Sequence, residues 1–160
     1  MALFRRKAKA VKETPAPKNE ILSVENIRIN QKAACSDDAI VAVGNQLVKA
    51  GFVSEGYIQG MLNRDHALTV WIGNDIAIPH GEYEVKDCVK KTGLAVDIYP
   101  EGIAWGGGTV RIVIGIAATT DEHITILQNI ADCLGDMDVV EKVVAGDPAY
   151  IHQVLTQGAH

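Results

Sequence analysis

One almost unbroken apolar run, VRIVIGIAA at residues 110–118, constrains the fold of this chain more than any other segment. Strands that are apolar on both sides are typical of the centre of a sheet whose two faces are covered. The run is also far shorter than the roughly 18 apolar residues that a membrane-spanning helix needs. It therefore predicts a central, buried β-strand.

Shorter strands and amphipathic helices are predicted around this run. Apolar residues at helical spacing follow Ser36, Ser54 and Thr120, and each of these residues is suited to begin a helix. Two further short helices are expected at residues 139–144 and 148–155. The other expected strands cover residues 22–30, 68–72, 75–78 and 92–99. This alternation favours an α/β sandwich, in which a mixed β-sheet is flanked by helices on both faces.

The first twenty residues differ in composition from the rest of the chain. Residues 1–19 contain six Lys or Arg and one Glu, whereas residues 20–160 contain nine basic and nineteen acidic residues. Because residues 1–20 show no apolar period and contain Pro-Ala-Pro, we expect a disordered basic tail or linker there and one folded domain over residues 21–158. The acidic domain argues against nucleic acid as a ligand. No apolar segment of a secretory signal follows the basic start, so a cytoplasmic location is expected.

His80 is the first candidate for chemistry, because it ends the apolar run IAIPH and precedes Gly81. Pro79 restricts the backbone before the histidine, and Gly81 adds no side chain that would crowd the imidazole. This pattern predicts a histidine presented in a rigid, open turn at the end of a buried strand. On local sequence alone, a turn histidine without a chemical role remains the alternative.

His123 and Arg64 are the other candidates. His123 falls in the first turn of the helix after the central strand, where backbone amides stabilise anions. Arg64 falls near the end of the second helix and carries the planar cation that best recognises phosphate. Each also has an ordinary structural explanation, as a first-turn histidine and as a cation that complements the helix dipole.

Motifs for nucleotide or metal chemistry are missing from the sequence. It contains no GxxxxGKS or GxxxxGKT loop, no HExxH and no zinc-type pair among Cys35, Cys88 and Cys133. The glycines at residues 106–108 precede a strand rather than a helix, which indicates a loose loop. An ATP-dependent kinase is therefore unsupported, and no cofactor or metal is expected.

The segment GNDIAIPHGE resembles the active-site segment of IIA components of the bacterial phosphoenolpyruvate-dependent sugar phosphotransferase system, specifically the mannitol/fructose class. In that class the phosphorylated histidine lies in an IPHG or VPHG context. The similarity extends over residues 26–155 and includes AGFVSEGYIQGMLNRD, KTGLAVDIYPEGIAWG and VIGIAATTDEHITILQNIADCL. The last two stretches are most similar to the mannitol-specific branch.

This resemblance implies a protein-histidine phosphotransferase component with His80 as its phosphorylated residue. His80 would accept a phosphoryl group from the carrier HPr as a tele-phosphohistidine and pass it to a cysteine of a IIB domain in a sugar permease, here for mannitol. Arg64 would lie near the phosphoryl group, and His123 would assist by hydrogen bonding. The resemblance also implies a mixed sheet flanked by helices, no cofactor, and contact with the membrane only through the permease.

Three alternatives stay open at the level of sequence. The first is a regulatory phosphoprotein of the nitrogen-branch IIA type, which would keep His80 without a role in transport. The second is a binding module without phosphate chemistry. The third is a metal site at His80 and His123, for which no third ligand is evident in the sequence.

Overall fold

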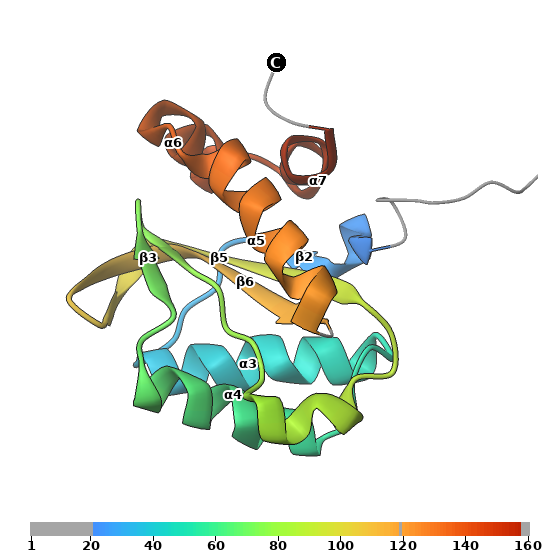
Figure 1. Ribbon diagram of the computed structural model, residues 1–160. Helices are drawn as coiled ribbons and strands as arrows, with labels where there is room; N and C mark the ends of the chain where they lie inside the picture. Colours follow the sequence, from blue (N-terminus) through green and yellow to red (C-terminus); the bar gives the residue numbers. More distant parts are fainter. Residues whose placement is uncertain (1–20, 119, 158–160) are drawn as a thin grey trace, which may run out of the picture.

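The computed structural model describes residues 21–118 and 120–157, with the side chains of residues 120–124 outside that description. The predicted tail at residues 1–20 also lies outside it. The described chain forms three layers, in which one sheet lies between two groups of helices (Figure 1). The predicted α/β sandwich is therefore confirmed.

The middle layer is a mixed sheet of five strands in the order β2-β5-β6-β4-β3. Its strands are β2 (Ile27–Arg28), β3 (Trp71–Gly73), β4 (Ile76–Ala77), β5 (Gly93–Trp105) and β6 (Gly108–Ala117). Strand β6 is central, as predicted. It pairs antiparallel with β5 and parallel with β4, and its residues 112–117 are all buried.

Helices cover both faces of this sheet. Helices α3 (Ser36–Lys49) and α4 (Gly56–Ala67) lie on one side, and α5 (Thr120–Leu134), α6 (Met137–Ala145) and α7 (Pro148–Gln157) lie on the other (Figure 1). Two 3-10 helices, η2 (Val24–Asn26) and η3 (Tyr83–Cys88), complete the fold. Apolar residues of α3 at helical spacing, among them Ile40, Val43 and Leu47, are fully buried, which is how the sequence period produces the packing.

Three local predictions were wrong. The strand expected at residues 22–30 is reduced to Ile27–Arg28, because η2 precedes it and Asn30 adopts a left-handed backbone with φ of 58°. The strand expected at residues 92–99 continues to Trp105. The glycines at residues 106–108 form a tight hairpin turn instead of a loose loop, since Trp105 pairs with Gly108 and Gly106 has φ of 55°.

His66 lies in the last turn of α4. Its Nε2 is 2.8 Å from Oδ1 of Asp37 in the first turn of α3, and this hydrogen bond raises the pKa of the His66 imidazole. Each charge also lies at the helix end that favours it. The pair therefore links the start of α3 to the end of α4 on the surface.

A charged pair joins the edge strand β2 to the interior of the sheet. Arg28 and Asp97 are register partners, and the guanidinium binds the carboxylate through two hydrogen bonds, Nε to Oδ1 at 2.8 Å and Nη2 to Oδ2 at 2.7 Å. Asp97 is fully buried, whereas the Arg28 side chain keeps 35% exposure. The hydrogen bond to Asp97 raises the pKa of Arg28, so the guanidinium keeps its positive charge beside the buried carboxyl group.

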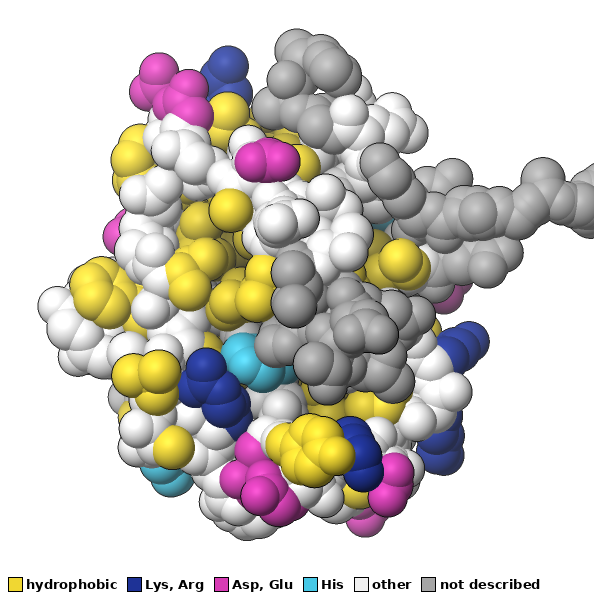
Figure 2. All heavy atoms as spheres, in the orientation of Figure 1, with side chains coloured by type: hydrophobic (Ala, Val, Ile, Leu, Met, Phe, Trp, Pro, Cys, Tyr) yellow, Lys and Arg dark blue, Asp and Glu magenta, His cyan; other side chains and the backbone are white. Residues whose placement is uncertain are grey.

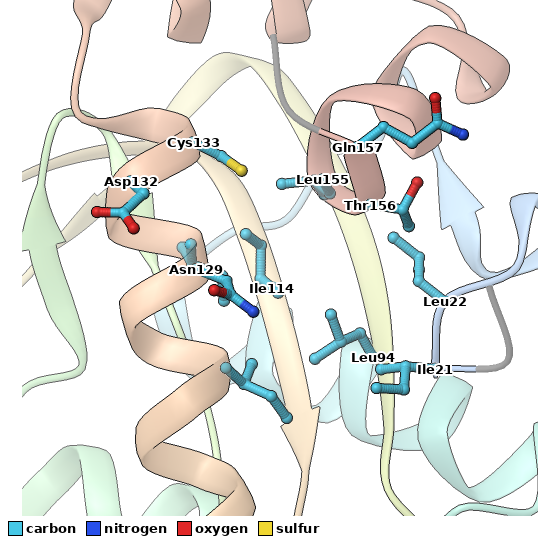
Figure 3. Close-up of a pocket in the computed structure, with 12 residues that line it drawn as sticks. Ile21, Leu22, Leu94, Ile114, Asn129, Asp132, Cys133, Leu155, Thr156 and Gln157 are labelled. Atoms are coloured by element: carbon cyan, nitrogen blue, oxygen red, sulfur yellow. The ribbon is translucent and has the colours of Figure 1, made fainter. Parts of the chain in front are cut away.

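A small cavity of about 220 Å³ opens between α5 and α7, away from α3 and α4 (Figure 3). Leu94 and Ile114 of the sheet lie at its floor, and Asn129 and Asp132 of α5 lie along its edge. Close by, His152 Nε2 donates to the carbonyl oxygen of Leu22 at 2.8 Å, so α7 holds the first described residues against the domain. No described helix is long and apolar enough to cross a membrane.

Candidate functional site

The backbone of His80 is fixed by the end of the central strand. Beyond β4 the chain continues alongside β6, where Ile116 N–H donates to the carbonyl of Pro79 at 2.9 Å and His80 pairs with Ile116 as a parallel bridge. Both segments run in the same direction, so His80 lies at the carboxyl end of two neighbouring strands. In open α/β sheets, ligands bind at that edge.

The imidazole of His80 is oriented by its own backbone. Nδ1 lies 2.7 Å from the carbonyl oxygen of Ile78, and the histidine is only 7% exposed. A carbonyl oxygen can only accept, so Nδ1 is the nitrogen that carries the proton in this arrangement. The lone pair of the neutral ring is then on Nε2, which makes Nε2 the nucleophilic atom.

Arg64 and His80 line one pocket of about 250 Å³, although they are far apart in the chain. Arg64 extends from α4, and its Nη1 donates to the carbonyl of Leu68 at the end of that helix. A second cation, Lys86 of η3, lines the same pocket and lies over the Tyr83 ring, with Nζ 4.8 Å from the ring centroid. The pocket therefore places two cations and one imidazole around a shared space, together with the carboxylate of Glu82, and the two cations suit it to an anion.

Apolar side chains border this pocket, and sequence reasoning did not identify them. Tyr83 of η3 lines the pocket and is 69% exposed, and Leu68, whose backbone carbonyl accepts from Arg64, is 67% exposed. On the face shown in Figure 2, an imidazole adjoins a basic side chain, with hydrophobic side chains gathered nearby. Large exposed apolar side chains next to a reactive group are suited to a protein partner.

Gly81 is required by close packing around the histidine turn. A Cβ atom at this position would lie 2.4 Å from Cε1 of Tyr57 and 2.8 Å from Cγ2 of Val85. The predicted reason for the glycine, space beside the imidazole, is therefore incomplete. Its main effect is to let α4 and η3 approach the backbone next to His80.

His123 lies in the first turn of α5, as its position after the central strand predicts. Its side chain is among those outside the described part of the structure. Ala118, two residues before α5 begins, lines the pocket together with His80. The start of α5 is therefore beside the pocket, and the role predicted for the His123 side chain stays a prediction.

One group of three side chains in the described part of the chain has the spacing of metal ligands: Asp37, Asp65 and His66, whose ligand atoms lie within 4.8 Å of one another. Contacts within the protein account for this group. Asp65 Oδ1 accepts from the Trp105 indole at 2.9 Å and from the Val70 amide at 3.0 Å, and Asp37 binds His66. The group is outside the His80 pocket and does not include its residues.

Known proteins share both the sequence and the fold. Residues 20–158 match the family described as "Phosphoenolpyruvate-dependent sugar phosphotransferase system, EIIA 2". A multiphosphoryl transfer protein of Escherichia coli O157:H7 is 43% identical over 86% of this chain, and the mannitol-specific EIICBA component of Escherichia coli K12 is 42% identical over 76%. The chain spans only 37% and 20% of those two relatives, respectively.

Solved structures agree with the sequence comparison. The crystal structure of IIA mannitol from Escherichia coli superposes with a TM-score of 0.79 at 39% identity, covering 83% of this chain and 97% of that one. The same enzyme in complex with phosphorylated enzyme IIB mannitol gives 0.76, also at 39% identity, covering 84% and 96%. Because the family match extends over all of the described residues, this chain belongs to the EIIA 2 family of the phosphoenolpyruvate-dependent sugar phosphotransferase system.

Proposed function

We propose that the chain is a phosphocarrier, which takes a phosphoryl group from phospho-HPr onto Nε2 of His80 and passes it to a cysteine of a IIB domain. The observation that carries this proposal is the hydrogen bond from His80 Nδ1 to the Ile78 carbonyl. It leaves Nε2 as the nucleophile inside a pocket that also contains Arg64 and Lys86. The similar mannitol IIA, solved in complex with phosphorylated IIB, supports a IIB domain as the partner.

The two proposed steps are matched displacements at phosphorus. In the first, the Nε2 lone pair of His80 forms an N–P bond while the N–P bond of the donor phosphohistidine breaks, and the electron pair stays on the donor imidazole. In the second, a IIB thiolate forms an S–P bond and the electron pair of the broken N–P bond returns to Nε2. Both steps depend mainly on positioning and on stabilising the charged phosphoryl oxygens.

The direct test is to incubate the protein with phosphoenolpyruvate, enzyme I and HPr, map the modified residue, and then add IIB domains. We expect one acid-labile, base-stable phosphoryl group on His80 that moves to the IIB cysteine. Labelling of His80 without transfer to any IIB domain would favour the regulatory alternative. An acid-stable label, or a label on another residue, would refute the mechanism.

We further propose that mannitol is the sugar served, that the protein acts in the cytoplasm, and that it meets the membrane only through the permease. Residues 21–158 would form the IIA domain and residues 1–20 a tail. The similarity to the mannitol IIA structure supports the sugar, although the multiphosphoryl transfer protein is equally similar in sequence. Transfer rates to a mannitol IIB and to a fructose IIB, measured side by side, decide between the two sugars.

Arg64→Ala is expected to slow transfer in both directions by roughly 10²–10³-fold, because it removes a fixed cation from the pocket wall. Arg64→Lys should recover part of the rate, since an ammonium cannot reproduce the planar fork. Single-turnover transfer from phospho-HPr gives the rates. Lys49→Ala, which removes a cation from the last turn of α3, is the matched control and should transfer normally. Wild-type rates for Arg64→Ala would exclude Arg64 from the site.

His123→Gln is expected to reduce transfer less than His123→Ala, because glutamine keeps a hydrogen-bond donor and alanine does not. This prediction follows from the proposed role of His123 in hydrogen bonding at the start of α5, next to the pocket. The same single-turnover assay measures both variants. Equal losses for both would indicate that the imidazole itself is needed, as in proton transfer.

A further inference from the structure

We infer that Tyr57 is a positioning residue, which holds the nucleophile His80 and the cation Arg64 in fixed relation through the backbone. This inference deepens the proposed function and rests on it, because its expected effects on phosphoryl transfer require that His80 is the phosphorylated residue. The structure places the Tyr57 phenol against two backbone segments next to His80, namely Ile116, which pairs with His80, and Gly81, which follows it.

The first contact is a hydrogen bond to the central strand. Tyr57 is 2% exposed, and its hydroxyl donates to the carbonyl oxygen of Ile116 at 2.7 Å. Ile116 is the same residue that pairs with His80 and whose N–H binds the carbonyl of Pro79. The phenol therefore ties α4 to the short stretch of β6 that sets the position of the histidine backbone.

The second contact is with Gly81, on the other side of His80. The Tyr57 ring lies so close to Gly81 that a Cβ there would be 2.8 Å from Cζ. Burial raises the pKa of the Tyr57 phenol, and a hydrogen bond with the Gly81 backbone partly opposes that rise. The phenol is therefore neutral at physiological pH and remains a donor to the Ile116 carbonyl.

The third relation is along α4. Arg64 is seven residues after Tyr57, which is close to two helical turns, so both side chains lie on similar sides of the helix and line one pocket. Holding the phenol against Ile116 and Gly81 thereby also holds the part of α4 that carries Arg64 beside the histidine turn. Because the hydroxyl is occupied by the Ile116 carbonyl, Tyr57 acts by position and not as a proton donor.

The test compares Tyr57→Phe with wild type, because phenylalanine keeps the ring against Gly81 and removes only the hydroxyl. We expect the maximum single-turnover rate to fall between about 10- and 100-fold, the loss that a small misplacement of reacting groups produces. Half-saturation by phospho-HPr should stay unchanged, since the exposed surface is untouched. Tyr99→Phe is the matched control, because Tyr99 is equally buried, on β5, and outside the His80 pocket.

A second readout needs no phosphoryl donor. In ¹⁵N spectra of the histidine rings, wild-type His80 should show a protonated Nδ1 and an unprotonated Nε2, and Tyr57→Phe should show a mixture of tautomers. Tyr99→Phe should keep the wild-type pattern. Rates are compared at a temperature at which circular dichroism shows the native spectrum for all three proteins.

The outcomes separate the two proposals. A lower melting temperature for Tyr57→Phe with unchanged rate and unchanged ¹⁵N signals would show a merely structural residue and overturn the inference. If wild type accepts no phosphate, the proposed function fails. The ring spectra then still decide whether Tyr57 positions His80.

Discussion

Replacing His80 with alanine is expected to abolish phosphoryl acceptance and to leave the fold intact. Nε2 of His80 is the proposed nucleophile, and no other imidazole lines the pocket among the described residues. The substitution removes the hydrogen bond from Nδ1 to the Ile78 carbonyl, and such a bond contributes about 1 kcal/mol to stability. The measurement is incorporation of radiolabelled phosphate from phosphoenolpyruvate through enzyme I and HPr, together with a thermal unfolding curve.

His66→Ala provides the matched control, since His66 is exposed at the end of α4 and binds Asp37 outside the pocket. This variant should be phosphorylated like wild type. Equal labelling of His80→Ala and wild type would place the phosphoryl group elsewhere. If His66→Ala is not labelled although His80 is intact, the His66–Asp37 contact between α3 and α4 is needed for phosphoryl acceptance, despite lying outside the pocket.

Replacing Arg28 with methionine is expected to lower the free energy of unfolding by about 3 kcal/mol. The substitution leaves the fully buried carboxylate of Asp97 without its cation, and the low end of the range for such losses applies because Arg28 is partly exposed. With a total stability of roughly 5–15 kcal/mol, this is a large fraction. Urea denaturation followed by circular dichroism gives the difference.

The double variant Arg28→Met/Asp97→Leu should recover much of that loss, because two packed apolar side chains replace a buried ion pair without an orphaned charge. Lys32→Ala is the control for a surface pair, since Lys32 and Glu101 are both exposed with 3.5 Å between Nζ and Oε2. Its effect should be below about 1 kcal/mol. If Arg28→Met lowers the free energy of unfolding no more than Lys32→Ala does, then Asp97 is solvated or protonated in the folded protein.

Local sequence patterns predicted the elements of the fold well, because helical periods and a doubly buried strand are short-range signals. Strand β6 and helices α3 to α7 all lie close to their predicted positions. The errors occurred where distant contacts decide the backbone. Strand β2 is only two residues long and is held by its pairing with β5, including Arg28 and Asp97, which are 69 residues apart.

The candidate site was harder to predict for the same reason. Taken singly, Arg64 and His80 each had an ordinary structural explanation, and only the resemblance to a family gave them a shared role. The pocket now brings Arg64 and His80 together. Tyr57 and Lys86 were missed as site residues: Lys86 lies outside the stretches that carry the resemblance, and Tyr57 lies in one of them without a chemical pattern that points to the pocket. The bond from Tyr57 to Ile116 joins residues 59 positions apart, and no local pattern indicates it.

The cavity between α5 and α7 also shows how this domain can be built into larger engineered molecules. Ile21 and Leu22 border the cavity from one end of the described chain, and Leu155 and Gln157 border it from the other (Figure 3). Chain ends that lie close together tolerate circular permutation and insertion into a host protein. None of these residues lines the His80 pocket, so a fluorescent reporter or tether joined next to Ile21 or Gln157 would be attached outside the lining of that pocket.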